Sequence, residues 1–344
     1  MHRQIAVILL SALLITTGGC MVHPITLEQE FNIVGEQKEL SIGRNAHPQI
    51  LQQFGTYHDP RLQRYVNELG QKIVGVCRRR DISYHFSILD DPMVNAFATP
   101  GGYIYITRGL LAYLNSEAEL AGVLAHEIGH VVGRDSAALM SQGLIAQLAT
   151  LAGVAGAATS GSGGDVAMAT SQLFNSIMLG FSREREYLAD EQSVEYIFNL
   201  GYDPLQIKSF LRTLSFMGQG PAGPQQYLVT HPYIFDRISR VESKSKVVAA
   251  MHTTMGQLKK SIDTVKGRRL VLAEKYKAYL DGLAFGPKDD LRRIKLYRVR
   301  PADSFESIAR KTLGSSTKAK LLAELNGIPI SAQLIPGAKI KIIY

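Results

Sequence analysis

The motif His126-Glu127-Ile128-Gly129-His130 combines residue types that bind a metal ion and activate water. Two histidines four residues apart lie on the same face of an α-helix, so both imidazoles can bind one ion. Glu127 is adjacent to the first histidine, and this offset lets its carboxylate approach a water beside the metal without becoming a ligand. The motif therefore predicts one Zn²⁺ per chain and a hydrolytic reaction with Glu127 as general base.

A catalytic zinc site needs a third protein ligand, and Glu186 is the downstream candidate. Two histidines and one glutamate form a known hydrolytic ligand set. A third histidine six residues after His130, as in metzincins, is disfavoured because Ser136 occupies that position. Asp190 lies four residues after Glu186 on the same helical face, where it could accept a hydrogen bond from a ligating imidazole. The alternative for both carboxylates is a solvated acidic face among neighbouring charges.

The segments that must position these residues have helical patterns. Residues 116–119, Ser-Glu-Ala-Glu, are typical of a capping box, and the apolar periodicity that follows predicts a helix at least to Val132. This helix carries the His-Glu motif. Ser182 is expected to cap a second helix over residues 183–200, which carries Glu186.

Other segments complete the predicted architecture. Helical patterns cover residues 27–54 and a stretch that begins at Asp59-Pro60. Residues 84–89 and 103–107 are expected to form strands of a small sheet. Residues 139–179 are rich in Ala, Gly, Leu and Ser and are interpreted as helix, loop and helix. A membrane span in that stretch is a weak alternative, because its apolar part is short.

Four blocks of sequence carry a family resemblance: residues 95–111, His126 to His130, Glu186-Tyr-Leu-Ala-Asp190, and Thr230-His231-Pro232. In the same order they resemble blocks of the M48 zinc metallopeptidase family, which includes the CAAX prenyl endoprotease, HtpX and BepA-like proteins. The resemblance covers about residues 25–250. It implies an α+β fold, with a mainly helical gluzincin-type metallopeptidase domain that contains a small β-sheet.

The resemblance also implies roles around the metal. Glu186 is expected to be the third zinc ligand, and Asp190 to support a ligating histidine. His231 is expected near the metal, where it stabilises the oxyanion or, in some resting forms, caps the zinc. Without the resemblance, a His-Pro pair would be an ordinary turn.

Substrate-binding residues follow from the same resemblance. Asn95 is expected to touch the substrate backbone. Tyr103, Ile104 and Tyr105 are expected to lie on an edge strand to which an extended peptide adds. The alternative is that residues 103–107 form an ordinary strand.

The first twenty residues have the outline of an export signal, with Arg3, an apolar run over residues 5–15, and Cys20 directly after two glycines. Cys20 resembles the lipidation site of bacterial lipoproteins, although Thr17 stands where that pattern prefers Leu. Plain signal cleavage and a retained anchor are the alternatives. We expect an exported lipoprotein on the periplasmic side of a bacterial membrane. Cys77 is then the remaining thiol, expected to be buried and inert.

The net charge of +8 is unevenly placed, since residues 259–344 hold 19 Lys and Arg against 8 Asp and Glu, a net +11. Residues 297–342 resemble a LysM-type module, a short βααβ unit that binds glycans. Ala302 stands where the opening turn of such modules usually has glycine. The basic charge alone is compatible with anionic lipid, cell-wall polymer or nucleic acid. With the LysM resemblance, the expected partner is peptidoglycan and not nucleic acid. The alternatives are a solubilising surface and structural capping of the protease domain.

These observations predict four segments: a signal peptide over residues 1–20, a zinc metallopeptidase domain over 21–255, a basic helical connector over 256–290, and a LysM-like module over 291–344. The leading interpretation is an envelope endopeptidase that cleaves misfolded or unassembled exported proteins. An alternative is an envelope assembly factor or chaperone-like adaptor with an autoinhibited zinc site, occluded by His231 and the 139–179 segment. Cell-wall hydrolysis is a third interpretation, supported by the tail alone.

Overall fold

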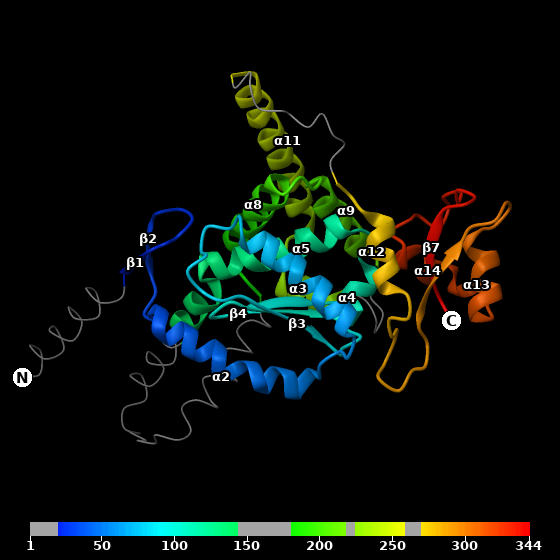
Figure 1. The fold of residues 1–344 in the computed structure, drawn as a ribbon, viewed down its shortest axis with the longest axis horizontal. Coiled ribbons are helices and arrows are strands. Elements are labelled where there is room, and N and C mark those ends of the chain that lie inside the picture. Colours follow the sequence, from blue (N-terminus) through cyan, green and yellow to red (C-terminus); the bar gives the residue numbers. More distant parts are fainter. Residues whose placement is uncertain (1–19, 144–179, 218–223, 259–269) are drawn as a thin grey trace, which may run out of the picture.

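The computed structural model describes residues 20–143, 180–217, 224–258 and 270–344. These ranges are mainly helical and contain three small sheets (Figure 1). The helices of the predicted metallopeptidase domain, called the peptidase part below, are α2 (Glu36–Phe54), α3 (Pro60–Val74), α4 (Arg108–Tyr113), α5 (Glu117–Gly133), α8 (Arg183–Asn199), α9 (Leu205–Phe216), α10 (Gln225–Thr230) and α11 (Ile234–Leu258). None of the helices in the described ranges is long and apolar enough to cross a membrane.

Helix α5 is the central element, because every one of its residues is buried. The Ser116 hydroxyl caps it by accepting a hydrogen bond from the Glu119 amide at 3.1 Å. The Glu119 carboxylate accepts from the amide of Asn115, one residue earlier than a capping box requires. A Cβ at Gly129 would lie 3.0 Å from the Cα of Ala189, so glycine at this position lets α8 pack closely on α5.

The main sheet contains β3 (His85–Leu89), β4 (Ala96–Thr99) and β5 (Tyr103–Thr107), in the order β3-β5-β4. Strand β5 is parallel to β3 and antiparallel to β4. The prediction that residues 103–107 form an edge strand is therefore wrong: their backbone is paired on both sides. The outer strands are β3 and β4, and β4 lies between the two strands predicted from the sequence, where no strand was expected.

The two faces of this sheet pack against different helices. Phe97 and Tyr105 lie on the face covered by α2, in a cluster with Ile50 and Phe54. Ile104 and Ile106, the neighbours of Tyr105 on β5, lie on the other face, in the larger core with residues of α3 and α5. This alternation is the period of two that a strand imposes. The sheet is thus a layer between α2 and the helices that carry the histidine motif (Figure 1).

A short hairpin precedes α2. Strands β1 (Cys20–Val22) and β2 (Gln29–Phe31) pair antiparallel, and Leu27 between them has a positive φ of 62°. The helix predicted over residues 27–54 therefore begins at Glu36, because the hairpin occupies the chain before it.

The C-terminal unit has the order β6 (Ile294–Arg298), α13 (Phe305–Leu313), the 3₁₀ turn η1 (Ser316–Lys318), α14 (Ala319–Leu325) and β7 (Lys339–Ile343). Strands β6 and β7 pair antiparallel. Its buried side chains, such as Ile308 and Leu322, belong to the same core cluster as Leu120 of α5. Figure 1 shows this unit beside α12 (Ala273–Leu280), at one end of the molecule. The unit and the peptidase part therefore share one continuous core.

The connector over residues 256–290 was expected to be helical, but its described part is helical only to Leu258 and again in α12. Residues 281–293 form turns and an isolated antiparallel bridge between Ala284 and Arg293. Gly282 and Gly286 have positive φ angles of 89° and 95°, and Pro287 follows. Glycine in this conformation and proline both end helices, which explains the difference.

Candidate metal centre

Two helices and the end of a third bring the predicted metal ligands together. His126 and His130 lie one turn apart on α5, and Glu186 lies on α8, which packs across α5 at Gly129. His231 directly follows α10. All four side chains are buried, and one candidate ligand atom from each lies within 4.8 Å of the others.

Four of the six distances between these atoms are close to those expected around one zinc ion, although the whole set extends to 4.8 Å. His126 Nε2 is 3.1 Å from His130 Nε2 and 3.3 Å from His231 Nδ1. Glu186 Oε1 is 3.4 Å from His130 Nε2 and 3.1 Å from His231 Nδ1. Four ligands at zinc-to-nitrogen distances of about 2.0 Å would be separated by about 3.3 Å. The donor set of three imidazoles and one carboxylate also fits zinc.

Each imidazole turns one nitrogen to the cluster and the other to an acceptor. His126 Nδ1 lies 2.9 Å from Asp190 Oδ1, and His130 Nδ1 lies 2.6 Å from Asp135 Oδ2. His231 Nε2 lies 3.2 Å from the backbone oxygen of Ala96. An acceptor at one nitrogen places the proton there, which leaves the other nitrogen free to bind a metal.

Arg237 of α11 neutralises the carboxylates behind the ligands. Its guanidinium lies 2.8 Å from Glu186 Oε2 and donates to both oxygens of Asp190 at 2.8 Å. Burial alone would raise the pKa of Glu186, but Arg237 and His231 hold this pKa well below its usual value. Burial likewise acts against ionisation of Asp190, and Arg237 again keeps its pKa low. Both carboxylates are therefore ionised, as a ligand and a hydrogen-bond acceptor must be.

In the metal-free chain, the carboxylates of Asp135 and Glu186 also change the pKa of His130. Burial lowers its pKa, but the hydrogen bonds with Asp135 and Glu186 outweigh burial and raise this pKa to about 10. A proton therefore takes the place of a metal ion on His130 at neutral pH.

Glu127 lies beside the cluster and accepts no hydrogen bond from the described residues. Its side chain is fully buried, and neither carboxylate oxygen has a hydrogen-bond partner among the described residues. The nearest ionisable group is His231, whose Nε2 lies 3.5 Å from Glu127 Oε1. A buried carboxylate without a partner is costly, so such a group is a candidate for a reaction with a bound molecule.

Two residues of the centre, Asp135 and Arg237, were missed by the sequence prediction. Asp135 follows the end of α5, outside the helical spacing that identified the ligands. Arg185, one residue before Glu186, forms ion pairs with Asp135 and with Glu30 of β2. The N-terminal hairpin is thus connected to His130 through two charged side chains. Arg237 lies six residues after His231, and this closeness in sequence to an expected metal-site residue was the available indication that it belongs to the centre.

The predicted substrate residues have different positions. Asn95 is buried directly before β4, and its side-chain oxygen accepts a hydrogen bond from Thr230, the neighbour of His231. Tyr105 lies on the α2 face of the sheet, where its hydroxyl is 2.8 Å from His47 Nδ1. The ring of Tyr103 lies 4.8 Å from the ring of the same histidine and is tilted to it by 31°, and Ile104 is buried in the core. Of this set, only Asn95 is placed beside His231.

The free edge of β4 faces the cluster instead. Because the Thr107 amide donates to Asn95 O, the alternation of an antiparallel pair turns the backbone groups of Ala96 and Ala98 away from β5. The Ala96 oxygen contacts His231, and the Ala98 oxygen accepts from the Ser136 hydroxyl at 3.1 Å. Two outward acceptors of this edge are thus already engaged by side chains.

Other expected features lie away from this centre. Cys77 is buried, and burial raises the pKa of its thiol. The predicted signal before Cys20 and most of the 139–179 segment lie outside the described residues.

Comparison with known proteins gives two family matches. The model of peptidase family M48 matches residues 58–245, more than half of the chain, and the model of the LysM domain matches residues 297–342.

Among the relatives, a β-barrel assembly-enhancing protease of Yersinia pestis is 29% identical over 210 residues, which cover 58% of this chain and 42% of the relative. The mitochondrial metalloendopeptidase OMA1 of Schizosaccharomyces pombe is 28% identical over 226 residues, which cover 64% of each chain. A protease HtpX homolog of Pyrobaculum calidifontis is 32% identical over 163 residues, covering 42% of this chain and 45% of the relative. The alignments with the Yersinia and Pyrobaculum proteins thus span less than half of those proteins.

Proposed function

The chain belongs to peptidase family M48, and from this membership we propose that it is a zinc-dependent endopeptidase of the gluzincin type. The observation that carries the proposal is the position of Glu127. Its carboxylate is buried beside a cluster of four candidate ligand atoms that lie within 4.8 Å of one another, and it has no hydrogen-bond partner among the described residues.

The residues have distinct roles in the proposed reaction. His126, His130 and Glu186 would hold the ion, which supplies the Lewis acidity that polarises a peptide carbonyl and acidifies water. Glu127 takes the proton of the attacking water and passes a proton to the leaving amine. Asp190 and Asp135 keep the imidazole protons on the nitrogens that face away from the ion.

We infer that the substrate backbone pairs with the free edge of β4. An extended peptide can add to a strand edge. The outward oxygens of Ala96 and Ala98 lie beside the cluster, buried and engaged by His231 and Ser136, so both contacts must open before a peptide pairs there. Asn95 directly precedes this edge and is positioned by Thr230. Once His231 leaves Ala96, its imidazole could donate to the developing oxyanion.

The direct test replaces the general base. Glu127→Gln removes proton acceptance while retaining the size of the side chain, so the variant should bind one zinc per chain and lose hydrolysis by a factor of about 100 or more. The exposed Glu184→Gln on α8 is the control and should retain both properties. Metal analysis and casein cleavage supply the two measurements. Unchanged hydrolysis in Glu127→Gln would refute the role of Glu127.

A second candidate function is an assembly factor or adaptor whose metal centre is autoinhibited. The observation that favours it is His231, which supplies a fourth ligand atom at the position that a catalytic zinc leaves open for water. His231→Ala discriminates between the two functions. Hydrolysis that appears only in this variant supports autoinhibition, whereas hydrolysis by the wild-type chain that falls in the variant supports a direct role for His231.

The setting of the activity is also a proposal. The relatives are named β-barrel assembly-enhancing proteases, so unassembled exported β-barrel proteins are the first substrate class to test. Quality control predicts that an unfolded β-barrel protein is cleaved and that the same protein folded in detergent is spared. Equal cleavage of the two forms would contradict it.

We further propose that the chain is held in the bacterial envelope at two places, by a lipid on Cys20 and by the LysM domain on peptidoglycan. Labelled palmitate should enter the wild-type chain and the Cys77→Ser control but not Cys20→Ser. Retention of the full chain by purified sacculi tests the second contact. The full chain is needed because the C-terminal unit shares its core with the peptidase part.

A further inference from the structure

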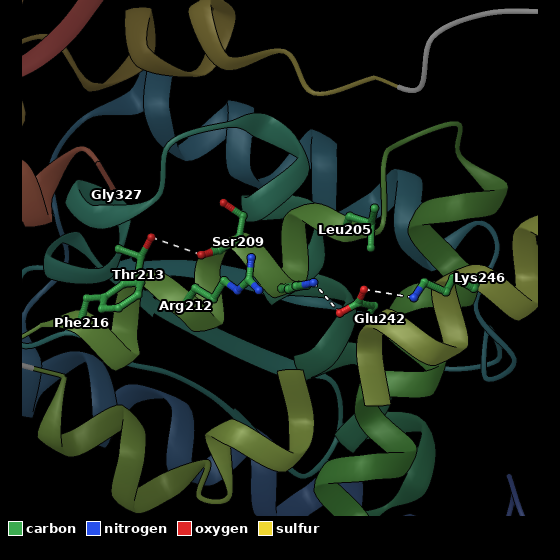
Figure 2. Close-up of a pocket in the computed structure, with 9 residues that line it drawn as sticks. Leu205, Ser209, Arg212, Thr213, Phe216, Glu242, Lys246 and Gly327 are labelled. Carbon is green, nitrogen blue, oxygen red and sulfur yellow. Dashed lines mark hydrogen bonds and ion pairs between the residues drawn. The ribbon is translucent and has the colours of Figure 1, made fainter. Parts of the chain in front are cut away.

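A groove with basic residues lies along α9, and none of the metal-centre residues lines it (Figure 2). One face of α9 forms its floor, with side chains at helical spacing: Leu205, Lys208, Ser209, Arg212, Thr213 and Phe216. Helix α11 contributes Glu242 and Lys246, and the C-terminal unit contributes Gly327. The cavity has a volume of about 390 Å³, within the range of ligand-binding pockets.

An apolar hollow of about 210 Å³ adjoins the groove and shares Thr213, Phe216 and Gly327 with it. Half of its remaining lining comes from the loop after α14, namely Ile328, Pro329 and Ile330, and the other half comes from α14 itself, namely Lys320, Ala323 and Glu324. Phe216 is 72% exposed and Ile330 is 46% exposed, so two large apolar side chains here are in contact with solvent. The groove and the hollow therefore form one surface across the peptidase part and the C-terminal unit.

The charges of the groove leave one cation available. Glu242 forms ion pairs with Lys208 and Lys246, which together lower the pKa of Glu242 to about 2. The guanidinium of Arg212 makes no ion pair with any side chain of the described residues. A planar guanidinium binds a carboxylate through two parallel hydrogen bonds, so Arg212 can accommodate an anionic group.

We propose that this surface binds a polypeptide segment in which a carboxylate lies beside a bulky apolar side chain. The carboxylate pairs with Arg212, and the apolar side chain enters the hollow between Phe216 and Ile330. A glycan fits this surface less well, because hydroxyl groups surround a sugar ring and would be buried against Ile328, Pro329 and Ile330 without partners.

The proposal rests on polypeptides as the substrate class of the proposed function. It adds a second contact for the client, outside the metal centre and composed from both parts of the chain. A client held here would remain bound while another of its segments reaches the β4 edge, which raises the effective concentration of that segment.

The test uses the full chain and a fluorescent peptide, acetyl-Gly-Ser-Asp-Phe-Ser-Gly-amide, with fluorescence anisotropy as the measurement. Arg212→Ala should raise the Kd of this peptide about tenfold or more, because a charged hydrogen-bond pair is lost. It should not change the Kd of the peptide with Asn in place of Asp. Phe216→Ala should raise the Kd of the Asp-Phe peptide. It should not change the Kd of the analogue with Ala in place of Phe, which binds more weakly to the wild-type chain. Arg310→Ala and Leu291→Ala, exposed residues outside both cavities, are the matched controls.

A peptide with a C-terminal Phe carboxylate and no Asp distinguishes the two possible sources of the anion. Stronger binding of this peptide identifies a chain terminus, and stronger binding of the Asp peptide identifies a side chain. Equal Kd values in wild type and Arg212→Ala would overturn the proposal, as would binding of soluble peptidoglycan fragments without peptide binding. Peptide binding without hydrolysis would retain this site and reject the proposed peptidase function, whereas hydrolysis without peptide binding would reject this site alone.

Discussion

Charged side chains are buried both at the metal centre and at the joint, which is the contact between Lys341 of the C-terminal unit and the end of α4. Different groups stabilise the buried charge in the two regions. At the metal centre, Arg237 is surrounded by the carboxylates of Glu186 and Asp190. At the joint, the buried ammonium of Lys341 donates to the backbone oxygens of Ala112 and Leu114 at 2.6 and 2.7 Å. These oxygens lie at the C-terminal end of α4, where the helix dipole favours a cation.

The metal centre pairs its cation with carboxylates because its function needs them ionised, whereas the cation of the joint has only a structural role. The metal centre requires ionised carboxylates, and an opposite charge keeps them ionised in a buried position. The joint requires only that polar groups be paired, and backbone oxygens meet this need. Burial accordingly lowers the pKa of Lys341 well below its usual value, whereas Arg237 has a raised pKa because of its carboxylate neighbours.

The largest effect is expected from Arg237→Met. The substitution retains much of the side-chain volume but leaves Glu186 and Asp190 buried without their cation. Breaking a buried ion pair in this way costs about 3–5 kcal/mol of the free energy of unfolding. Urea denaturation of the metal-free chain measures the loss, with the exposed Arg64→Met as the control. A loss below about 1 kcal/mol would show that the carboxylates do not depend on Arg237.

The next effect concerns Asp135, which orients His130 without touching the ion. Asp135→Ala should weaken zinc binding by about 10- to 100-fold, the usual result when the hydrogen-bond partner of a ligating histidine is removed. Chelator competition measures the dissociation constant, and Asp81→Ala, which is exposed, serves as the control. Unchanged zinc affinity would mean that α5 alone positions His130.

Zinc affinity should also depend on pH through His130. The folded metal-free chain holds a proton on His130 below about pH 10, and zinc must displace it. Affinity should therefore rise with pH, by up to tenfold per unit for each proton displaced, and level off near pH 10. Asp135→Ala lowers the pKa of His130, so the rise should end at a lower pH. Calorimetry in buffers of different ionisation enthalpy measures the protons released, and no proton release at pH 7 would contradict the prediction.

The smallest effect is expected at the joint. Lys341→Met leaves two backbone oxygens unpaired, which costs about 1–2 kcal/mol. It also removes a cation that acts on the buried Glu119 without a direct ion pair among the described residues. The loss should be smaller than that of Arg237→Met in the same urea experiment, with the exposed Lys318→Met as the control. A loss of unfolding free energy in Lys341→Met that equals or exceeds the loss in Arg237→Met would show that the joint depends on its buried cation at least as much as the metal centre does.

The sequence predicted the features that depend on helical spacing. His126 and His130 share a face of α5, and Glu186 and Asp190 share a face of α8, because local periodicity fixes both relations. Asp135 reaches His130 around the end of a helix, a relation that no fixed spacing encodes.

Tertiary packing decided the remaining features. Arg237 and Lys341 reach their partners across long stretches of chain. Strand β4 was missed because Ala96-Phe97-Ala98-Thr99 lies between a buried strand and two glycines, where the pattern favours a loop. Its pairing with β5 moved β5 from the edge to the centre of the sheet.

The most direct test of the central claim is a crystal of the zinc-loaded chain, with anomalous scattering data collected on both sides of the zinc absorption edge. One anomalous peak per chain is expected, about 2.0–2.2 Å from His126 Nε2, His130 Nε2 and an oxygen of Glu186. The absence of a peak among these three residues, or a zinc ion bound elsewhere in its place, would rule out the proposed zinc site.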